Sequence, residues 1–271
     1  TSLATSSTAP SAPQQSAPPP STNDTGVHPD TESNHPIPDE LEVLPPRKPL
    51  LRLELRDLDS KGSRSFLRLV HATNALEHAV STVLHHLYLS LPTHCIPPTR
   101  SVTLVLEAMD GVAYTTGSSL DSDHKSIHLS TDYIMHVSET RRKEEIMGVL
   151  VHEMVHCWQH DAEGTAPGGL IEGIADWVRL KAGFAPPHWK KSAGDDDKWD
   201  SGYERTGFFL EWLEDRFGVD IVRKVNAGLR ECKYEDGKVW KDCCGTDVEA
   251  LWGDYKKSLN NGDEGKESKE E

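Results

Sequence analysis

The sequence His152-Glu153-Met154-Val155-His156 lies inside the apolar run 146–155, whose spacing predicts a buried α-helix. Positions i and i+4 of an α-helix are about 40° apart in projection, so both imidazoles would lie on one face and could bind one metal ion. Glu153 would lie beside that ion without coordinating it. This HExxH arrangement is typical of a zinc site with an open coordination position, where a carboxylate accepts a proton from an acidified water.

A third ligand is needed, because the five-residue pattern alone also occurs by chance. The metzincin arrangement would place a glycine three residues after the second histidine and a histidine six residues after it, but these positions are Gln159 and Ala162. The metzincin arrangement is therefore excluded. His160 continues the same helical face, but three histidines along one helix extend too far to converge on one ion. We expect His160 to be a surface histidine or a histidine that contacts one of the metal-binding side chains without binding the metal itself.

Two acidic residues in the segment PGGLIEGIADWV (167–178) are better candidates, because this segment reads as a turn followed by a strongly apolar helix. Glu172 and Asp176 again have i, i+4 spacing. Burying two carboxylates on one helical face is unfavourable unless a cation or hydrogen-bond donors compensate. Glu172 could be the third ligand, and Asp176 could accept the N–H of a liganding histidine and orient it. The alternative is that both acids face solvent.

The run from Val149 to Ala182, especially HEMVHCWQH followed by APGGLIEGIADWVRLKAG, resembles the plant and fungal basic secretory protein family. The resemblance extends to the segments VAYTTGSSLD and IHLS, to WDSGYERTGFFLEWLE and to the ending VEALWGDYK, and so covers about residues 50 to 258. Members of this family are regarded as zincin-like metallopeptidases. The resemblance therefore implies a zincin-like fold and a peptidase activity, although this chain is acidic.

The resemblance also implies roles for individual residues. It implies His152 and His156 as zinc ligands and Glu153 as the general base, and the pair Glu172 and Asp176 resembles the ExxxD element of gluzincins. Only 15 residues lie between His156 and Glu172, fewer than is usual in gluzincins, whereas Asp176 lies at a more usual distance. Either acid could therefore be the third metal ligand, and Glu172 is the favoured candidate.

Strand and helix patterns around this core predict the fold class. Residues 51–56 alternate apolar and charged side chains, which predicts a strand with one buried face, and residues 102–106 and 126–130 predict two further strands. Apolar residues at helical spacing predict one helix over 65–89, and helical patterns dominate from Arg142 onward. Because strands come first and helices afterwards, we expect an α+β, zincin-like domain with an N-terminal mixed sheet and helices, the HExxH helix and a mainly helical C-terminal part.

Residues 126–130 precede the HExxH helix, where zincins commonly place an edge strand that binds an extended peptide through main-chain hydrogen bonds. The sequence leaves open whether this strand is an edge or an interior strand. The segment 111–123, which contains glycine and aspartate, is interpreted as the connection that leads to it.

Tyr203 begins a further predicted helix, whose apolar residues are expected in the core: Phe208, Phe209, Trp212 and Leu213. A tyrosine hydroxyl near zinc could stabilise a developing oxyanion, which makes Tyr203 a candidate catalytic residue. A tyrosine that caps the core is the commoner arrangement, and the sequence favours it. We also expect Trp158 and Trp177, beside the two motif helices, to be packing residues.

Composition limits the number of domains and the class of partner. Residues 1–45 are interpreted as a disordered Ser/Thr/Pro-rich tail, and residues 260–271, with five acids and two lysines, as an acidic disordered tail. One domain over 46–259 is expected, as a monomer. The net charge of −15 disfavours nucleic acid as a partner, and no run approaches the roughly 18 apolar residues of a membrane span.

Five cysteines do not define the redox compartment. None forms a C-x-x-C pair, although Cys232 could pair with Cys243 or Cys244 in an oxidising setting. The sequence begins at Thr1 without an apolar targeting core, so it leaves a secreted and a cytoplasmic location equally open.

The leading hypothesis is a zinc-dependent endopeptidase that acts on peptide or protein substrates, with Zn²⁺ as its cofactor and Glu153 as the proton carrier. A second hypothesis is a catalytically weak or inactive zincin fold that acts as a binding or defence-related protein. A third is a zinc-dependent amidase for small substrates, which would require a closed pocket.

Overall fold

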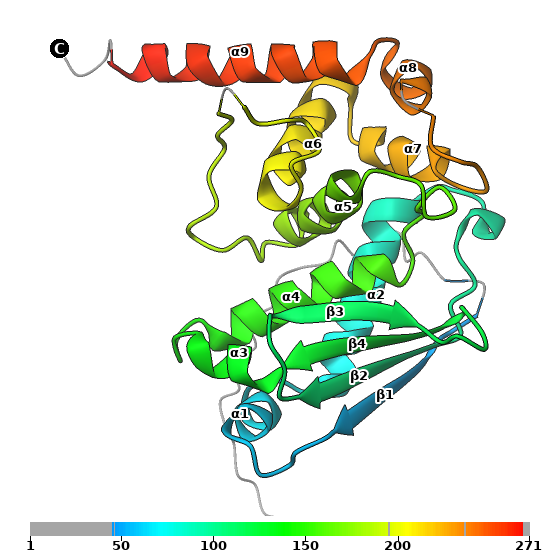
Figure 1. Ribbon diagram of the computed structural model, residues 1–271, viewed down its shortest axis with the longest axis vertical. Helices are drawn as coiled ribbons and strands as arrows, with labels where there is room; N and C mark the ends of the chain where they lie inside the picture. The colour runs from blue at the N-terminus through cyan, green and yellow to red at the C-terminus, as the bar shows by residue number, and fades with distance from the viewer. Residues whose placement is uncertain (1–44, 46, 195, 236, 268–271) are drawn as a thin grey trace, which may run out of the picture. The chain divides into compact units, whose positions relative to one another are not determined.

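The computed structural model describes residues 45, 47–194, 196–235 and 237–267. Its sheet contains strands β1 (Leu50–Leu55), β2 (Ser101–Glu107), β3 (Ala113–Gly117) and β4 (His124–Ser130) in the order β1-β2-β4-β3 (Figure 1). β1, β2 and β4 are parallel, and β3 is antiparallel to β4. Two α-helices lie between β1 and β2, and the other described α-helices follow β4 along the chain, so the predicted α+β class with a mixed sheet is confirmed.

One face of the sheet is built from alternating apolar residues of the two central strands. Leu104 and Leu106 of β2 are in register with Ile127 and Leu129 of β4, and all four are fully buried. This face carries helices α2 (Ala72–Tyr88) and α4 (Arg142–His156) (Figure 1). The alternation follows from the period of a strand, in which successive side chains point to opposite faces.

The position of the edge strand differs from the expectation. Residues 126–130 form part of β4, which lies between β2 and β3, so they are an interior strand and the edge-strand alternative is wrong. The edge next to β4 is β3, whereas β1 forms the other edge, and β3 lies in the segment 111–123, for which the sequence predicted no strand. Its sequence AYTTG has neither the length nor the apolar alternation that identifies a strand, and only its pairing with β4 defines it.

The predicted single helix over 65–89 is wrong, because two helices occupy this region. α1 (Lys61–Leu69) ends at Val70, whose backbone is extended, and α2 begins after His71, whose ring accepts a hydrogen bond from the backbone N–H of Asn74. Apolar residues keep a helical spacing across the break, so the pattern gave no sign of it.

The remaining described helices follow the sheet along the chain. After α3 (Thr131–His136) and α4 come α5 (Gly168–Lys181), α6 (Tyr203–Phe217), α7 (Ile221–Gly228), α8 (Lys238–Cys244) and α9 (Val248–Glu267). α5 lies along α4, and α6 packs on α5 (Figure 1). The α5–α6 contact is close, because a Cβ atom at Gly173 would lie 2.2 Å from Cγ2 of Thr206.

Several further expectations concern packing and the chain ends. Trp158 and Trp177 are buried at 0% and 2% exposure, so their predicted packing role is confirmed. All five cysteines have free thiols.

α9 continues into the segment 260–271, while 268–271 and nearly all of 1–45 lie outside the described residues. None of the described helices is long and apolar enough to cross a membrane.

Candidate active site

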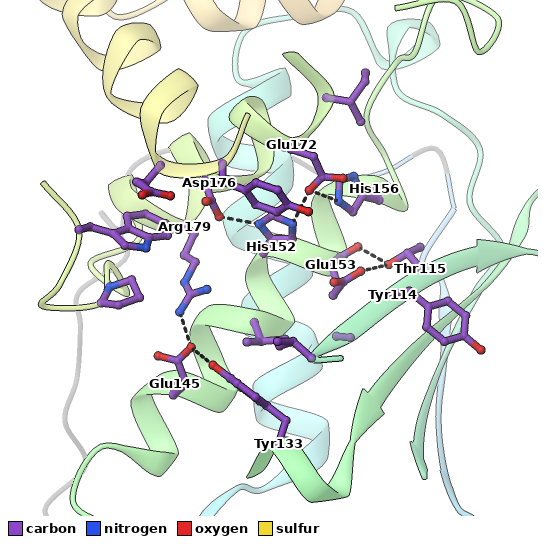
Figure 2. Close-up of a pocket in the computed structure, with 18 of the residues that line it drawn as sticks. Tyr114, Thr115, Tyr133, Glu145, His152, Glu153, His156, Glu172, Asp176 and Arg179 are labelled. Carbon is purple, nitrogen blue, oxygen red and sulfur yellow. Dashed lines mark hydrogen bonds and ion pairs between the residues drawn. The ribbon is translucent and has the colours of Figure 1, made fainter. Parts of the chain in front are cut away.

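Helices α4 and α5 bring together the histidines and acids that the sequence singles out (Figure 2). The apolar residues of α4 are buried against the sheet and α2, which leaves His152 and His156 facing α5. Oε2 of Glu172 lies 3.1 Å from Nε2 of His152 and 3.7 Å from Nε2 of His156. One ligand atom from each of these three residues lies within 4.8 Å of the others.

These distances test whether a zinc ion fits the three side chains. Zinc binds histidine nitrogen and carboxylate oxygen at about 2.0–2.2 Å, and tetrahedral geometry then separates neighbouring ligand atoms by about 3.4 Å. The two distances from Glu172, 3.1 and 3.7 Å, bracket this value. Two imidazoles and one carboxylate are also a donor set that zinc commonly uses, so the three residues fit the ion in chemistry and in spacing.

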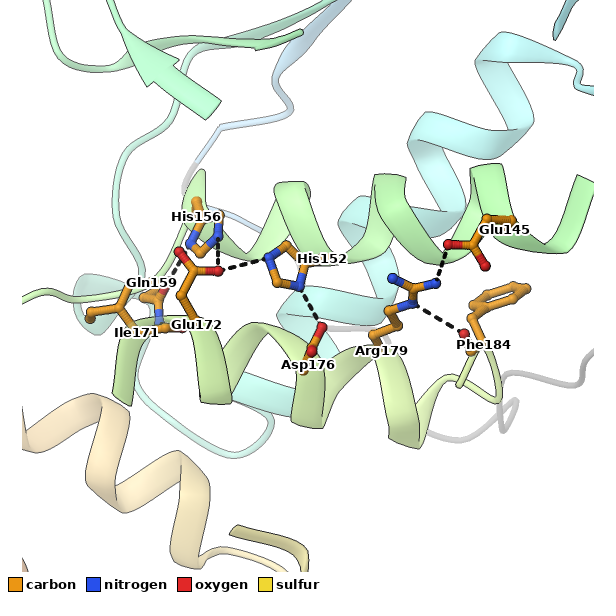
Figure 3. Close-up of polar contacts among 9 residues, drawn as sticks. All are labelled: Glu145, His152, His156, Gln159, Ile171, Glu172, Asp176, Arg179 and Phe184. Atoms are coloured by element: carbon orange, nitrogen blue, oxygen red, sulfur yellow. Dashed lines mark hydrogen bonds and ion pairs between the residues drawn. The ribbon is translucent and has the colours of Figure 1, made fainter. Parts of the chain in front are cut away.

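Asp176 contacts the opposite nitrogen of the His152 ring (Figure 3). Its carboxylate is 2% exposed, and Nδ1 of His152 donates to Oδ1 at 2.6 Å. This hydrogen bond fixes the ring orientation and directs Nε2 toward Glu172. The structure therefore places the two acids on different atoms of one imidazole.

Gln159 orients the second histidine, a role that the sequence analysis missed. Nδ1 of His156 donates to Oε1 of Gln159 at 2.8 Å, and Nε2 of Gln159 donates to the carbonyl of Ile171 at 2.9 Å (Figure 3). The only signal in the sequence was its position three residues after His156. His160 lies elsewhere, where its Nε2 donates to the carbonyl of Cys95 at 2.9 Å.

The proton affinities of the cluster reflect these contacts. Burial lowers the pKa of His152, but hydrogen bonds to Asp176 and Glu172 outweigh burial and raise the pKa to about 9. Burial raises the pKa of Glu172, but hydrogen bonds from His152 and His156 lower it well below its usual range. In the metal-free protein a proton thus holds the imidazole and the carboxylate together, at the position that a cation could take.

Glu153 lies on the wall beside this cluster and is 6% exposed. Its Oε2 accepts a hydrogen bond of 2.7 Å from the hydroxyl of Thr115, which also lies 3.0 Å from the main-chain carbonyl of Glu153 (Figure 2). Thr115 belongs to the edge strand β3, and it could not be identified from a segment in which no strand was predicted.

Tyr203 does not cap the core, so the favoured structural interpretation is wrong. The residue is 56% exposed, and its ring stacks on that of His152 with centroids 6.2 Å apart and 10° between the planes. Gly202 adopts φ = 86° just before it, a conformation that glycine reaches without strain and that turns Tyr203 over the site. The Glu172 carboxylate raises the pKa of Tyr203, so its hydroxyl stays protonated and can donate. Phe208, Phe209 and Leu213 are buried as expected, whereas Trp212 is only partly buried and packs against the core.

The cluster opens into a cavity of 780 Å³ between β3, α4, α5 and the loop that precedes α6 (Figure 2). His152, Glu153, His156, Glu172 and Tyr203 line its centre. Beyond His152 the cavity continues along α4 to a second group of residues, Tyr133, Glu145, Val149, Arg179, Pro186, His188 and Trp189.

Fold and site together define an α+β protein with a His–His–Glu cluster that could hold a metal ion, in a cleft beside the edge of a sheet. A family model described as BSP, peptidase of plants and bacteria, matches residues 48–255. The match spans most of the chain, so the chain belongs to this family, and the resemblance seen in the sequence is confirmed. No curated protein and no solved structure gives a significant match to the chain.

Proposed function

We propose that this chain is a zinc-dependent endopeptidase with a zincin-like active site. The observation that carries the proposal is the convergence of His152, His156 and Glu172, with Glu153 beside them, on an open cleft. Membership of a peptidase family supports the same reaction class.

His152, His156 and Glu172 would hold the ion. Asp176 is the weaker candidate for third ligand, because its carboxylate lies on Nδ1 of His152, the nitrogen that points away from Glu172. Asp176 and Gln159 would instead fix the two imidazoles, each through one Nδ1–H. Bound zinc would supply Lewis-acid chemistry, polarising a carbonyl oxygen and lowering the pKa of water.

Glu153 would move the proton. One of its oxygens is held by Thr115, which leaves the other free to take a proton from the attacking water and to pass it to the leaving amine. The protonated hydroxyl of Tyr203, above His152, would donate to the carbonyl oxygen as negative charge develops there.

The free edge of β3 supports a peptide substrate. The Ser130 N–H donates to the Val112 carbonyl, and the Ser118 N–H donates to the His124 carbonyl, each at 2.9 Å. In an antiparallel ladder hydrogen-bonded residues alternate, so the backbone groups of Ala113 and Thr115 point away from β4. Both residues line the cleft, where they could add an extended peptide to the sheet. This edge favours a peptidase over an amidase for small substrates.

Cleavage of an unbiased peptide library by the zinc-loaded chain tests the proposal. We expect cleavage that a zinc chelator abolishes, and a decrease of about 10²-fold or more in turnover for Glu153→Gln, with unchanged zinc content. Glu249→Gln is the matched control and should cleave as the native chain does, because Glu249 is exposed on α9 and belongs to neither the cleft lining nor the metal cluster. Absence of chelator-sensitive cleavage by fully zinc-loaded protein would instead support the inactive, binding alternative.

A further inference from the structure

A buried ion pair that the proposed chemistry does not use lies at the far end of the cleft (Figure 2). Nη2 of Arg179 is 2.9 Å from Oε1 of Glu145, and the two residues are 7% and 8% exposed. The hydroxyl of Tyr133 donates to the same oxygen at 2.8 Å. Buried ion pairs add little net stability, because desolvation opposes their attraction. The position of this pair in the cleft wall therefore points to a role in recognition.

Arg179 is held rigidly in place. Its Nε donates to the carbonyl of Phe184 at 3.1 Å, and its guanidinium carbon lies 5.2 Å from the ring centroid of Trp189. The guanidinium also rests on the backbone of α4 at Gly148, where a Cβ atom would lie 2.6 Å from Nε. A fixed guanidinium loses little rotamer freedom when it binds a ligand.

The guanidinium keeps free donors that face the cleft. Arginine has five N–H groups, of which Glu145 and Phe184 take two. Among the described residues Nη1 of Arg179 has no acceptor, and it is not one of the buried atoms that lack a partner, so this atom is accessible. Arg179 also lines the cavity, and Nη1 is therefore open to a ligand there.

The hydrogen-bonding groups at this end of the cleft favour an acceptor. Arg179 and the hydroxyl of Tyr133 both contact Oε1 of Glu145, and Arg141, which also pairs with Glu144 at 3.2 Å, lies 4.0 Å from Oε2. Val149, Pro186 and Trp189 make much of this wall apolar, and His188 also lines it. An acceptor that enters here meets unused N–H donors, whereas a basic side chain would meet a carboxylate that is already paired.

We propose that Arg179 binds a carboxylate of the peptide substrate, either the side chain of an acidic residue or the C-terminus of the peptide. Arginine recognises carboxylates by two parallel hydrogen bonds, and Nη1 with the free N–H of Nη2 presents such a pair. This specificity rests on the proposed function for the scissile site, but carboxylate binding itself needs no turnover.

Binding of labelled alanine-based peptides to full-length, zinc-loaded Glu153→Gln measures the preference without cleavage. The first arm uses peptides with an amidated C-terminus and compares glutamate with glutamine at each position in turn. The second arm compares one peptide sequence with a free C-terminal carboxylate against the same sequence with a C-terminal amide. We expect at least one arm to show tighter binding of the carboxylate by about 10-fold or more. The arm that does so identifies the source of the carboxylate.

Two variants ask whether Arg179 is responsible. Arg179→Gln combined with Glu145→Gln removes both charges of the pair together, and Gly148→Ala displaces the guanidinium while keeping both residues. In each, the affinities for carboxylate and amide should become equal within about 2-fold, with unchanged zinc content and circular dichroism. Arg68→Gln, at an exposed pair with Glu139, should keep the preference.

Equal binding of carboxylate and amide by the parent protein, binding of no peptide, or a preference that survives both variants would overturn the inference. Cleavage of the same peptides by the native chain reports separately on the proposed function. Carboxylate preference without cleavage would refute only the peptidase proposal, and cleavage without preference would refute only the role of Arg179.

Discussion

Asp176→Asn should weaken zinc binding without abolishing it. The native carboxylate is 2% exposed and accepts from Nδ1 of His152 at 2.6 Å, so it holds the ring and increases the basicity of Nε2. Asparagine keeps the size of the side chain but removes the charge. Loss of such a partner typically reduces metal affinity by about 10–100-fold, which corresponds to about 1.4–2.7 kcal/mol.

Competition with a fluorescent zinc chelator at fixed pH measures this loss. Asp215→Asn, an exposed aspartate on α6, is the matched control and should bind zinc as the native chain does. Glu172→Gln should lose the ion almost entirely, because it removes a ligand. Unchanged affinity in Asp176→Asn would refute the orienting role, and a loss as complete as that of Glu172→Gln would make Asp176 a ligand.

Three further predictions concern Thr115, His152 and the N-terminal segment. Thr115→Val should lower turnover about 10-fold with unchanged zinc content, because Glu153 loses its 2.7 Å hydrogen bond; equal turnover would contradict this. In metal-free protein the pKa of His152 is raised from 6.5 to about 9, so protonated His152 stabilises the fold fully below pH 6.5. That contribution, roughly 3 kcal/mol, is lost as the pH rises through 9, and the difference in Tm between native and His152→Gln protein should shrink over this range. Removal of residues 1–44 should leave Tm and zinc content unchanged, because this segment is poor in apolar residues; a lower Tm would show that it packs on the domain.

The parts of the site that could be predicted from sequence are those set by local periodicity. His152 and His156, and likewise Glu172 and Asp176, have i, i+4 spacing on apolar helices, so each pair had to share a face. The apolar residues of the central strands alternate with period two, and this pattern was sufficient to predict strands β2 and β4. These features depend on neighbours within about one turn of helix or a few residues of strand.

The parts that could not be predicted depend on contacts between distant segments. Thr115 meets Glu153 only because β3 pairs with β4 at the sheet edge, and Arg179 reaches Glu145 only because α5 lies along α4. Tyr203 was assigned to the core because aromatic residues usually pack, whereas the backbone at Gly202 turns it over His152. Pairing and packing of this kind leave no periodic signal in one sequence.

Elemental analysis of the purified, zinc-supplemented protein at neutral pH tests the central claim most directly. The account predicts close to one zinc per chain for the native protein and for Glu153→Gln, and almost none for Glu172→Gln or for the double variant His152→Ala with His156→Ala. A folded native chain that contains no zinc, or a Glu172→Gln variant that retains it fully, would contradict the assignment of His152, His156 and Glu172 as the metal site.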